Sequence, residues 1–342
     1  MVTRSLAVAL AAMVVSGTAA AQDSITFASW GGSFQKAERN AFLDPAEKAL
    51  GIVIKEDTTN GIADVRAQVQ SGAPIWDVAE MGSGTCAQAQ DEGIIEPLDY
   101  SVINTDGIDP GLVGTHWVGI IYYATVIGWN TEKLGDKGPA NWAEFWDAER
   151  FPGSRAVYAK PYYNLEAAML AAGKSPKEVY PIDIELGFEM LAKLKPHVGV
   201  FWKSGAQSAQ LMKDGEVDMI SIWNGRIGNA IKDGAKAKYT FDQQILDFDC
   251  LVVPKGAKNK DLAMKAINEF LKPENQAELP FHINYGPVND KAFDVPNKIT
   301  AEMAADLPSS PANRAKATVF NPSWYVGKMD MLQERYDFLI QE

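Results

Sequence analysis

Strand-like and helical segments alternate along this chain, and that alternation constrains its fold more than any other feature. Residues 24–28 alternate between polar and apolar side chains, as in a half-buried strand. Phe34, Ala37 and Ala41 then lie at the spacing of one helix face. The same alternation continues to the end of the sequence. Because strands that alternate with helices are typical of layered α/β proteins, we expect an α/β fold with mainly parallel strands.

The pattern predicts strands and helices over most of the chain. Strands are expected at residues 24–28, 51–55, 76–80, 117–129, 156–159, 198–201, 218–223 and 246–253. Helices are expected from residue 34 to a break at Pro45, then to residue 50 with Asp44 as the cap, and at 62–70, 85–92, 142–148, 187–194, 208–214, 262–271 and 329–340. The strand at 218–223 is expected to end at residues 224–226 and to lead into a further helix that runs through residue 233. The long apolar strands near 122–129 and 246–253 are candidate crossovers between two lobes.

The first 22 residues have the pattern of a secretory signal peptide. Arg4 precedes an apolar stretch at residues 6–15, and the alanines at 19–21 are small enough for signal peptidase. The apolar stretch is shorter than the roughly 20 residues that a transmembrane helix needs. We therefore predict that the mature chain begins near residue 22 or 23 and works in the periplasm.

Length and charge narrow the classes of function. The chain has 342 residues, 46% hydrophobic and 22% charged, which suits a globular protein with room for two domains. The formal net charge of -12 disfavours contact with phosphate backbones, so no nucleic-acid partner is expected. Cys86 and Cys250 could form one disulfide or stay as two buried thiols. With three scattered histidines they show no metal-ligand spacing, so we predict neither a metal nor a cofactor.

Four motifs occur in a characteristic order. They are Phe-Ala-Ser-Trp at 27–30, Trp-Asp-Val-Ala at 76–79, Met-Lys-Asp-Gly-Glu-Val-Asp at 212–218 leading into Ile-Trp-Asn-Gly at 222–225, and Asp-Cys-Leu-Val-Val-Pro at 249–254. In this order they resemble the bacterial extracellular solute-binding proteins of ABC importers, in particular the spermidine/putrescine-binding branch. The resemblance covers essentially the whole mature chain.

The resemblance implies a two-lobe periplasmic-binding-protein fold (type II) that closes on a small ligand by a hinge in crossing strands. Residues 23–124 and 247–305 would form lobe I, and residues 125–246 and 306–342 would form lobe II. Both cysteines would lie in lobe I. The implied partners are a small-molecule ligand and the membrane permease subunits of an ABC transporter, with the receptor itself a monomer.

The resemblance also implies a set of ligand-binding residues. Carried over residue by residue, Trp30 matches an aromatic cover over the ligand, Trp223 an aromatic wall, Asp249 an amine-binding carboxylate, and Tyr285 an aromatic near the pocket mouth. Loops at strand ends line the cleft in such folds. The predicted set is completed by Ser33, Met81, Ser83, Tyr162, Tyr163, Trp202 and Arg226.

Arg226 departs from the polyamine-binding pattern. That branch carries Trp-x-Gly-Asp, whereas this chain has arginine at the fourth position, after Trp223. Tyr162 and Tyr163 stand where another carboxylate is expected. A buried ammonium without a partner costs several kcal/mol, whereas the planar fork of arginine suits a carboxylate. The 4-aminobutyrate-binding members pair one arginine with one aspartate, so we expect a zwitterion of this type, with a polyamine as the alternative.

Structural interpretations of the same residues stay open. Arg226 could pair with Glu216 or Asp218 at a helix start, and Asp249 could brace the crossover strand. Trp30 and Trp223 could be ordinary core aromatics. The pair Tyr162 and Tyr163 could serve packing alone.

Two other classes of function also stay open. Ferric-ion binding would use adjacent tyrosines, which occur at 122–123 and 162–163. A secreted hydrolase would use Cys86 or a serine as nucleophile, but no Gly-x-Ser-x-Gly motif occurs. We expect a binding protein and not an enzyme.

Overall fold

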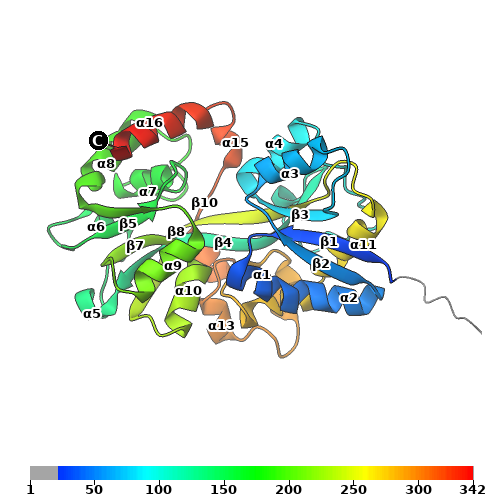
Figure 1. Cartoon of the computed structure of the whole chain (residues 1–342). Helices are drawn as coiled ribbons and strands as arrows, with labels where there is room; N and C mark the ends of the chain where they lie inside the picture. The colour runs from blue at the N-terminus through cyan, green and yellow to red at the C-terminus, as the bar shows by residue number, and fades with distance from the viewer. Residues whose placement is uncertain (1–21, 342) are drawn as a thin grey trace, which may run out of the picture.

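The computed structural model describes residues 22–341, and one mixed sheet runs through it (Figure 1). The predicted signal peptide, apart from Gln22, lies outside the described residues. The strand order is β2-β1-β3-β8-β4-β7-β5-β6, with β10 beside β8 and β9 beside β4. The strands are β1 (Ser24–Ser29), β2 (Val53–Thr58), β3 (Val78–Gly82), β4 (Trp117–Asn130), β5 (Arg155–Tyr158), β6 (Val198–Trp202), β7 (Met219–Trp223), β8 (Ala237–Val252), β9 (Gly286–Pro287) and β10 (Thr318–Val319).

The middle of the sheet is an antiparallel ribbon made of β4 and β8, here called the central ribbon. Its register runs from Trp117 opposite Val252 to Asn130 opposite Ala237, with two shifts along the way. By contrast, β1 pairs in parallel with β2 and β3, and β5 with β6 and β7. The expected parallel strands therefore form the two ends of the sheet, while the centre is antiparallel.

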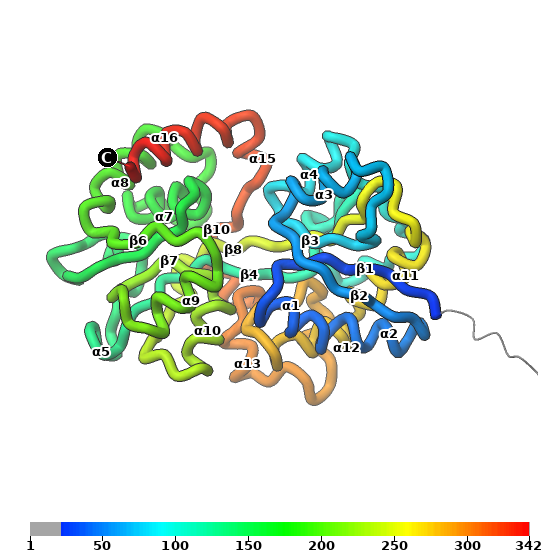
Figure 2. The backbone as a smooth tube through the Cα atoms, viewed as in Figure 1, coloured from blue at the N-terminus to red at the C-terminus, as the bar shows by residue number. Residues whose placement is uncertain are grey.

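Helices cover the sheet in two halves, one at each end of the central ribbon (Figures 1 and 2). This arrangement confirms the predicted two-lobe α/β fold. The helices are α1 (Gly32–Glu38), α2 (Asp44–Leu50), α3 (Ile62–Gln70), α4 (Ser83–Asp91), α5 (Thr131–Leu134), α6 (Trp142–Trp146), α7 (Asn164–Ala171), α8 (Ile184–Leu194), α9 (Gly205–Lys213), α10 (Asn224–Lys232), α11 (Lys260–Phe270), α12 (Pro273–Gln276), α13 (Ala301–Ala305), α14 (Pro311–Arg314), α15 (Pro322–Tyr325) and α16 (Met329–Gln341). Across residues 22–341, no helix combines the length and apolarity that a bilayer crossing requires.

The first helical segment does not break at Pro45, so that prediction is wrong. A π-helical turn at Arg39–Leu43 joins α1 to α2 without a gap. Pro45 directly follows this turn, as the second residue of α2, and the wider π-helical spacing accommodates the proline within the continuous helical segment. Asp44 makes no capping hydrogen bond and instead pairs with Arg39 at 3.3 Å.

A disulfide joins Cys86 of α4 to Cys250 of β8, across 164 residues of sequence. The two Cα atoms lie 6.5 Å apart, and Cys250 stands opposite Met81 of β3 in the sheet. The alternative of two free thiols is therefore wrong. The bond fixes α4 onto the central ribbon at the end that carries β3.

The C-terminal segment returns across the sheet. β10 pairs with β8 at Ile245 and Leu246, and α15 then contacts α4. The hydroxyl of Tyr325 donates to the buried carboxylate of Glu166 at 2.7 Å. The chain ends in α16, which lies on the other half beside α8 (Figure 1).

Candidate functional site

Two aspartates on the central ribbon define the site. Asp247 and Asp249 are two residues apart on β8, so their side chains leave the same face of the strand. Both are buried where the halves meet. The indole Nε1 of Trp30, which follows β1, donates to Oδ2 of Asp249 at 3.1 Å. Trp30 and Asp249, distant in sequence, are therefore in direct contact.

Asp247 is saturated by donors from the protein. Its carboxylate accepts hydrogen bonds from the hydroxyls of Ser83 at 2.6 Å, Tyr163 at 2.7 Å and Tyr123 at 3.0 Å. Burial raises the pKa of Asp247, and these donors oppose the rise. Sequence reasoning missed Asp247, although its two-residue spacing from Asp249 places it on the same face. The hydroxyls of Ser83 and Tyr163, both predicted to bind ligand, are committed to this carboxylate.

Two more buried carboxyl groups lie behind Asp249. Glu38 of α1 and Glu80 of β3 both hydrogen-bond the hydroxyl of Ser29, which lies 2.6 Å from Glu80 Oε2. A hydroxyl has one proton to donate, so one of the two contacts needs a proton on the carboxyl group. Burial raises the pKa of Glu38 to about 8. Burial and the charge of Glu80 raise the pKa of Asp249 well above its usual range.

Arg226 lies in the first turn of α10, directly after β7. Its guanidinium lies beside the hydroxyl of Tyr285, which is buried. Burial raises the pKa of Tyr285 to about 12, although the charge of Arg226 opposes this and the charge of Asp249 adds to it. The pKa of Tyr285 is therefore affected by both Arg226 and Asp249, which lie near its hydroxyl.

Arg226 has no salt bridge among residues 22–341, and its buried Nε has no hydrogen-bond partner there. The rival pairing with Asp218 is not formed, since that carboxylate accepts from the backbone N–H of Ser154 at 2.7 Å. Gly205 of α9 leaves the space that Nε occupies, because a Cβ at this position would lie 2.6 Å from it.

Aromatic rings form a wall around Trp223. The ring of Tyr158 is 5.5 Å away, Trp202 5.1 Å and Tyr123 6.1 Å, measured between centroids. Trp202 is fully buried, and its Nε1 donates to the carbonyl of Ser221 at 2.9 Å, so it supports the wall from behind. The Nε1 of Trp223 is buried with no partner in the described part of the chain.

The three remaining predicted residues make other contacts. Ser33 is exposed, and its hydroxyl accepts from Asn229 of α10 at 3.3 Å. Met81 is fully buried within β3. Tyr162 packs against Tyr163 and Phe320, with centroid distances of 5.0 and 6.2 Å, at the edge of the aromatic wall.

The adjacent tyrosines do not act as pairs. Tyr122 lies under the guanidinium of Arg314 at 5.3 Å, while Tyr123 and Tyr163 meet at Asp247. Within residues 22–341, no group of three His, Cys, Asp or Glu side chains could hold a metal ion. Cys86 is held in the disulfide and is not a free nucleophile.

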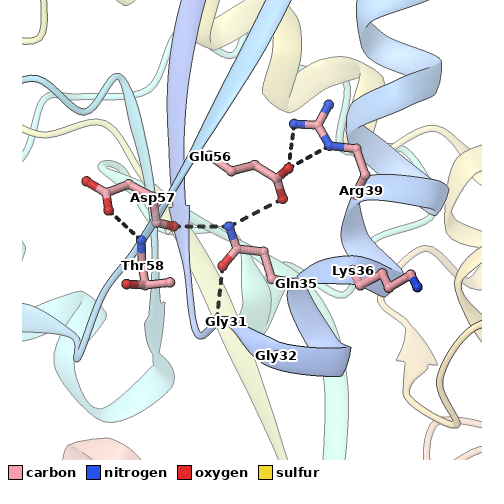
Figure 3. Close-up of a pocket in the computed structure, with 8 residues that line it drawn as sticks. All are labelled: Gly31, Gly32, Gln35, Lys36, Arg39, Glu56, Asp57 and Thr58. Carbon is pink, nitrogen blue, oxygen red and sulfur yellow. Dashed lines mark hydrogen bonds and ion pairs between the residues drawn. The ribbon is translucent and has the colours of Figure 1, made fainter.

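A separate recess lies just outside the site (Figure 3). It has a volume of about 470 Å³ and is bounded by the Gly31–Gly32 turn, the first helix and β2. Several of its polar groups are paired with one another: Gln35 donates to the carbonyl of Asp57 at 3.1 Å, and Arg39 donates to Glu56 at 2.9 Å. The recess is lined by neither Arg226 nor Asp249 and is not our candidate site.

Two sheet-and-helix halves around buried, oppositely charged groups define a protein that captures a solute between its halves. Residues 41–308 match the family model described as bacterial extracellular solute-binding protein, and the chain belongs to this family. It is 31% identical over 325 residues to a gamma-aminobutyric acid-binding protein of Pseudomonas aeruginosa, covering 93% of this chain and 91% of the relative.

Two further similarities extend the comparison. A spermidine/putrescine-binding periplasmic protein of Escherichia coli is 28% identical over 257 residues, covering 72% of this chain and 71% of the relative. This chain is also similar to the PBP MotA from A. tumefaciens B6, whose crystal structure was solved in complex with glucopine. The two sequences are 38% identical, and the two structures superpose with a TM-score of 0.86 over 93% of this chain and 99% of that one.

Proposed function

We propose that the protein is the periplasmic receptor of an ABC importer and captures a small zwitterion of the 4-aminobutyrate type between its lobes. Arg226 binds the carboxylate and Asp249 binds the amine. The single observation that carries this proposal is Arg226, a cation at the cleft with a buried Nε and no anionic partner among the described residues. A partly buried charge is stable only with a counter-charge and hydrogen bonds, and a ligand carboxylate supplies both in bidentate geometry.

The amine end of the ligand is assigned to Asp249. Its Oδ2 accepts from Trp30, and its carboxyl group also shares a hydrogen bond with Glu80 that an arriving ammonium would replace. The buried Glu38 and Glu80 behind it make this end of the cleft acidic. Trp30 and Trp223 cover the methylene chain and contribute about 0.5–2 kcal/mol through cation–π contact. The gamma-aminobutyric acid-binding relative supports the same ligand class.

The proposal includes closure about the central ribbon, with lobe I formed by residues 23–124 and 247–305 and lobe II by 125–246 and 306–342. The hydrogen bond between Ser33 and Asn229 crosses this boundary. A closed form presents one defined shape to the permease subunits of the importer. The receptor works as a monomer in the periplasm.

A polyamine is the second candidate. The buried acids around Asp249 favour a cationic group at that end, and the spermidine/putrescine-binding relative supports this class. A diamine, however, would place its second ammonium against Arg226. Repulsion there favours the zwitterion over putrescine.

Calorimetry decides between the two ligands. The parent protein is titrated with 4-aminobutyrate, putrescine and spermidine, beside Arg226→Ala, Asp249→Asn and the exposed control Arg150→Ala. We expect Arg226→Ala to cost about 3–5 kcal/mol of 4-aminobutyrate binding, or two to three decades in Kd. The control should bind as the parent does. Tighter binding of putrescine than of 4-aminobutyrate to the parent would contradict the proposal.

A further inference from the structure

Asn224 connects three separate elements at the start of α10. Its side chain is fully buried. Its Oδ1 accepts from the backbone N–H of Ala124 in β4 at 2.9 Å. Its Nδ2 donates to the backbone carbonyl of Asn284. The first residue of the helix is therefore fixed both to the central ribbon and to the segment 283–285, which precedes β9.

Glycines bring α10 into direct contact with the same segment. A Cβ at Gly225 would lie 2.4 Å from the ring of Tyr285, so no other residue fits there without a shift. A Cβ at Gly228 would lie 3.2 Å from the side chain of Asn284, a milder conflict. The contact is closest at the turn of α10 that carries Arg226.

The side chain of Asn284 fixes the segment from the other side. Its Oδ1 accepts from Nζ of Lys232, the last residue of α10, at 2.9 Å, and its Nδ2 donates to Asp306. Both ends of α10 are thus tied to residue 284. Tyr285, the next residue, lies beside Arg226.

We propose that Asn224 is a positioning residue for ligand recognition, which in the closed form holds α10 of lobe II against segment 283–285 of lobe I so that Arg226 and Tyr285 together face the ligand carboxylate. Asn224 does not touch the ligand. It acts indirectly, because it fixes the position of Arg226, which lies two residues later on the same turn of α10. The inference rests on the proposed role of Arg226.

The test compares two ligands that differ only at the carboxylate end. Titrations with 4-aminobutyrate and 4-amino-1-butanol give a ratio of dissociation constants, which reports recognition of the carboxylate and not overall stability. Asn224→Ala removes both hydrogen bonds. Gly225→Ala disturbs Tyr285 while leaving Asn224 in place, so it keeps the test decisive if Asn224→Ala fails to fold.

Asn164→Ala is the matched control. Asn164 is also the first residue of a helix, is buried, and donates to the carbonyls of Tyr158 and Lys160 at 2.6 and 2.8 Å. Its loss should lower the melting temperature without changing the ligand ratio. Gly228→Ala, one turn later on α10, should cause a smaller displacement than Gly225→Ala, because its Cβ would lie 3.2 Å from Asn284 and not 2.4 Å from Tyr285.

We expect Asn224→Ala and Gly225→Ala to reduce the preference for 4-aminobutyrate at least about tenfold, toward the ratio of Arg226→Ala. If both variants keep the ratio of the parent while Arg226→Ala loses the preference, the role of Asn224 is overturned and the proposed function stands. If Arg226→Ala itself keeps the parent ratio, the proposed function is what fails.

Discussion

The hydroxyl of Ser29 lies between two buried carboxyl groups next to Asp249, and its single proton can be donated to only one of them. It contacts both Glu38 and Glu80 with a single hydroxyl proton. Burial and the neighbouring Glu38 raise the pKa of Glu80 well above its usual range. The acids behind Asp249 are therefore partly protonated near neutral pH, and an arriving ammonium favours their ionised forms.

Glu38→Gln should change the pH dependence of stability. The folded pKa of Glu38, about 8, lies above the ordinary value of 4.5, so folding takes up a proton. This contribution is complete below pH 4.5 and is lost as the pH rises through 8. Over that window the free energy of unfolding of the parent should fall by up to about 1.4 kcal/mol per pH unit relative to the variant.

Urea unfolding at several pH values between 5 and 8 measures this difference. The exposed Glu189→Gln on α8 is the control, since its carboxylate pairs only with Lys193 at the surface. Its profile should follow that of the parent. Parallel profiles for Glu38→Gln and the parent would show that Glu38 ionises normally in the folded chain.

Asp247→Asn should behave as a structural change. Three side-chain hydroxyls donate to this carboxylate, and an amide can accept on one oxygen only. Leaving buried donors unpaired costs about 1–3 kcal/mol, so thermal unfolding should show a lower melting temperature. The preference for 4-aminobutyrate over 4-amino-1-butanol should persist, and a variant that loses it would place Asp247 in ligand recognition.

Sequence motifs singled out candidate site residues that lie at or beside the motifs. Asp249 and Trp30 were predicted from the family motifs and meet in the structure, and Arg226 was found as a departure from one of them. Glu38 and Glu80 were not predicted to matter. One lies inside a helix and the other inside a strand, and a single sequence does not show that the fold buries both against the same hydroxyl.

At the scale of elements, apolar periodicity located most strands and helices. The first part of β8 was missed, because residues 238–244 are largely polar and only their pairing with β4 makes them a strand. The helix α7 was also missed. Pro45 misled the prediction because the π-helical turn that accommodates it leaves no pattern in the sequence.

The disulfide should stabilise the half that carries β3. It closes a loop of 164 residues and holds α4 on the central ribbon. Replacing both cysteines with alanine should cost about 2–4 kcal/mol, seen as a lower midpoint in chemical unfolding. Ligand affinity should change little, because the side chains of Cys250 and Asp249 are neighbours on β8 and leave opposite faces of the strand. Equal midpoints for the parent and the double variant would show that the bond adds no stability.

At the scale of the whole molecule, the two halves should move about the central ribbon. Small-angle scattering should report a smaller radius of gyration when 4-aminobutyrate saturates the parent. Arg226→Ala at the same ligand concentration should stay open, because it lacks the charge that couples the ligand to α10. A parent that begins open and keeps its radius with bound ligand would contradict hinged closure.

The order in which the sheet is completed has a consequence for export. β8 lies between β3 and β4, yet it begins only at residue 237, long after β3 ends at residue 82 and β4 at residue 130. A nascent chain thus lacks the middle of its sheet until residues 237–252 have been synthesised. Long-range pairing of this kind folds slowly. The central ribbon can therefore form only late in synthesis, which suits a chain that must cross a membrane before it folds, as we propose for this receptor.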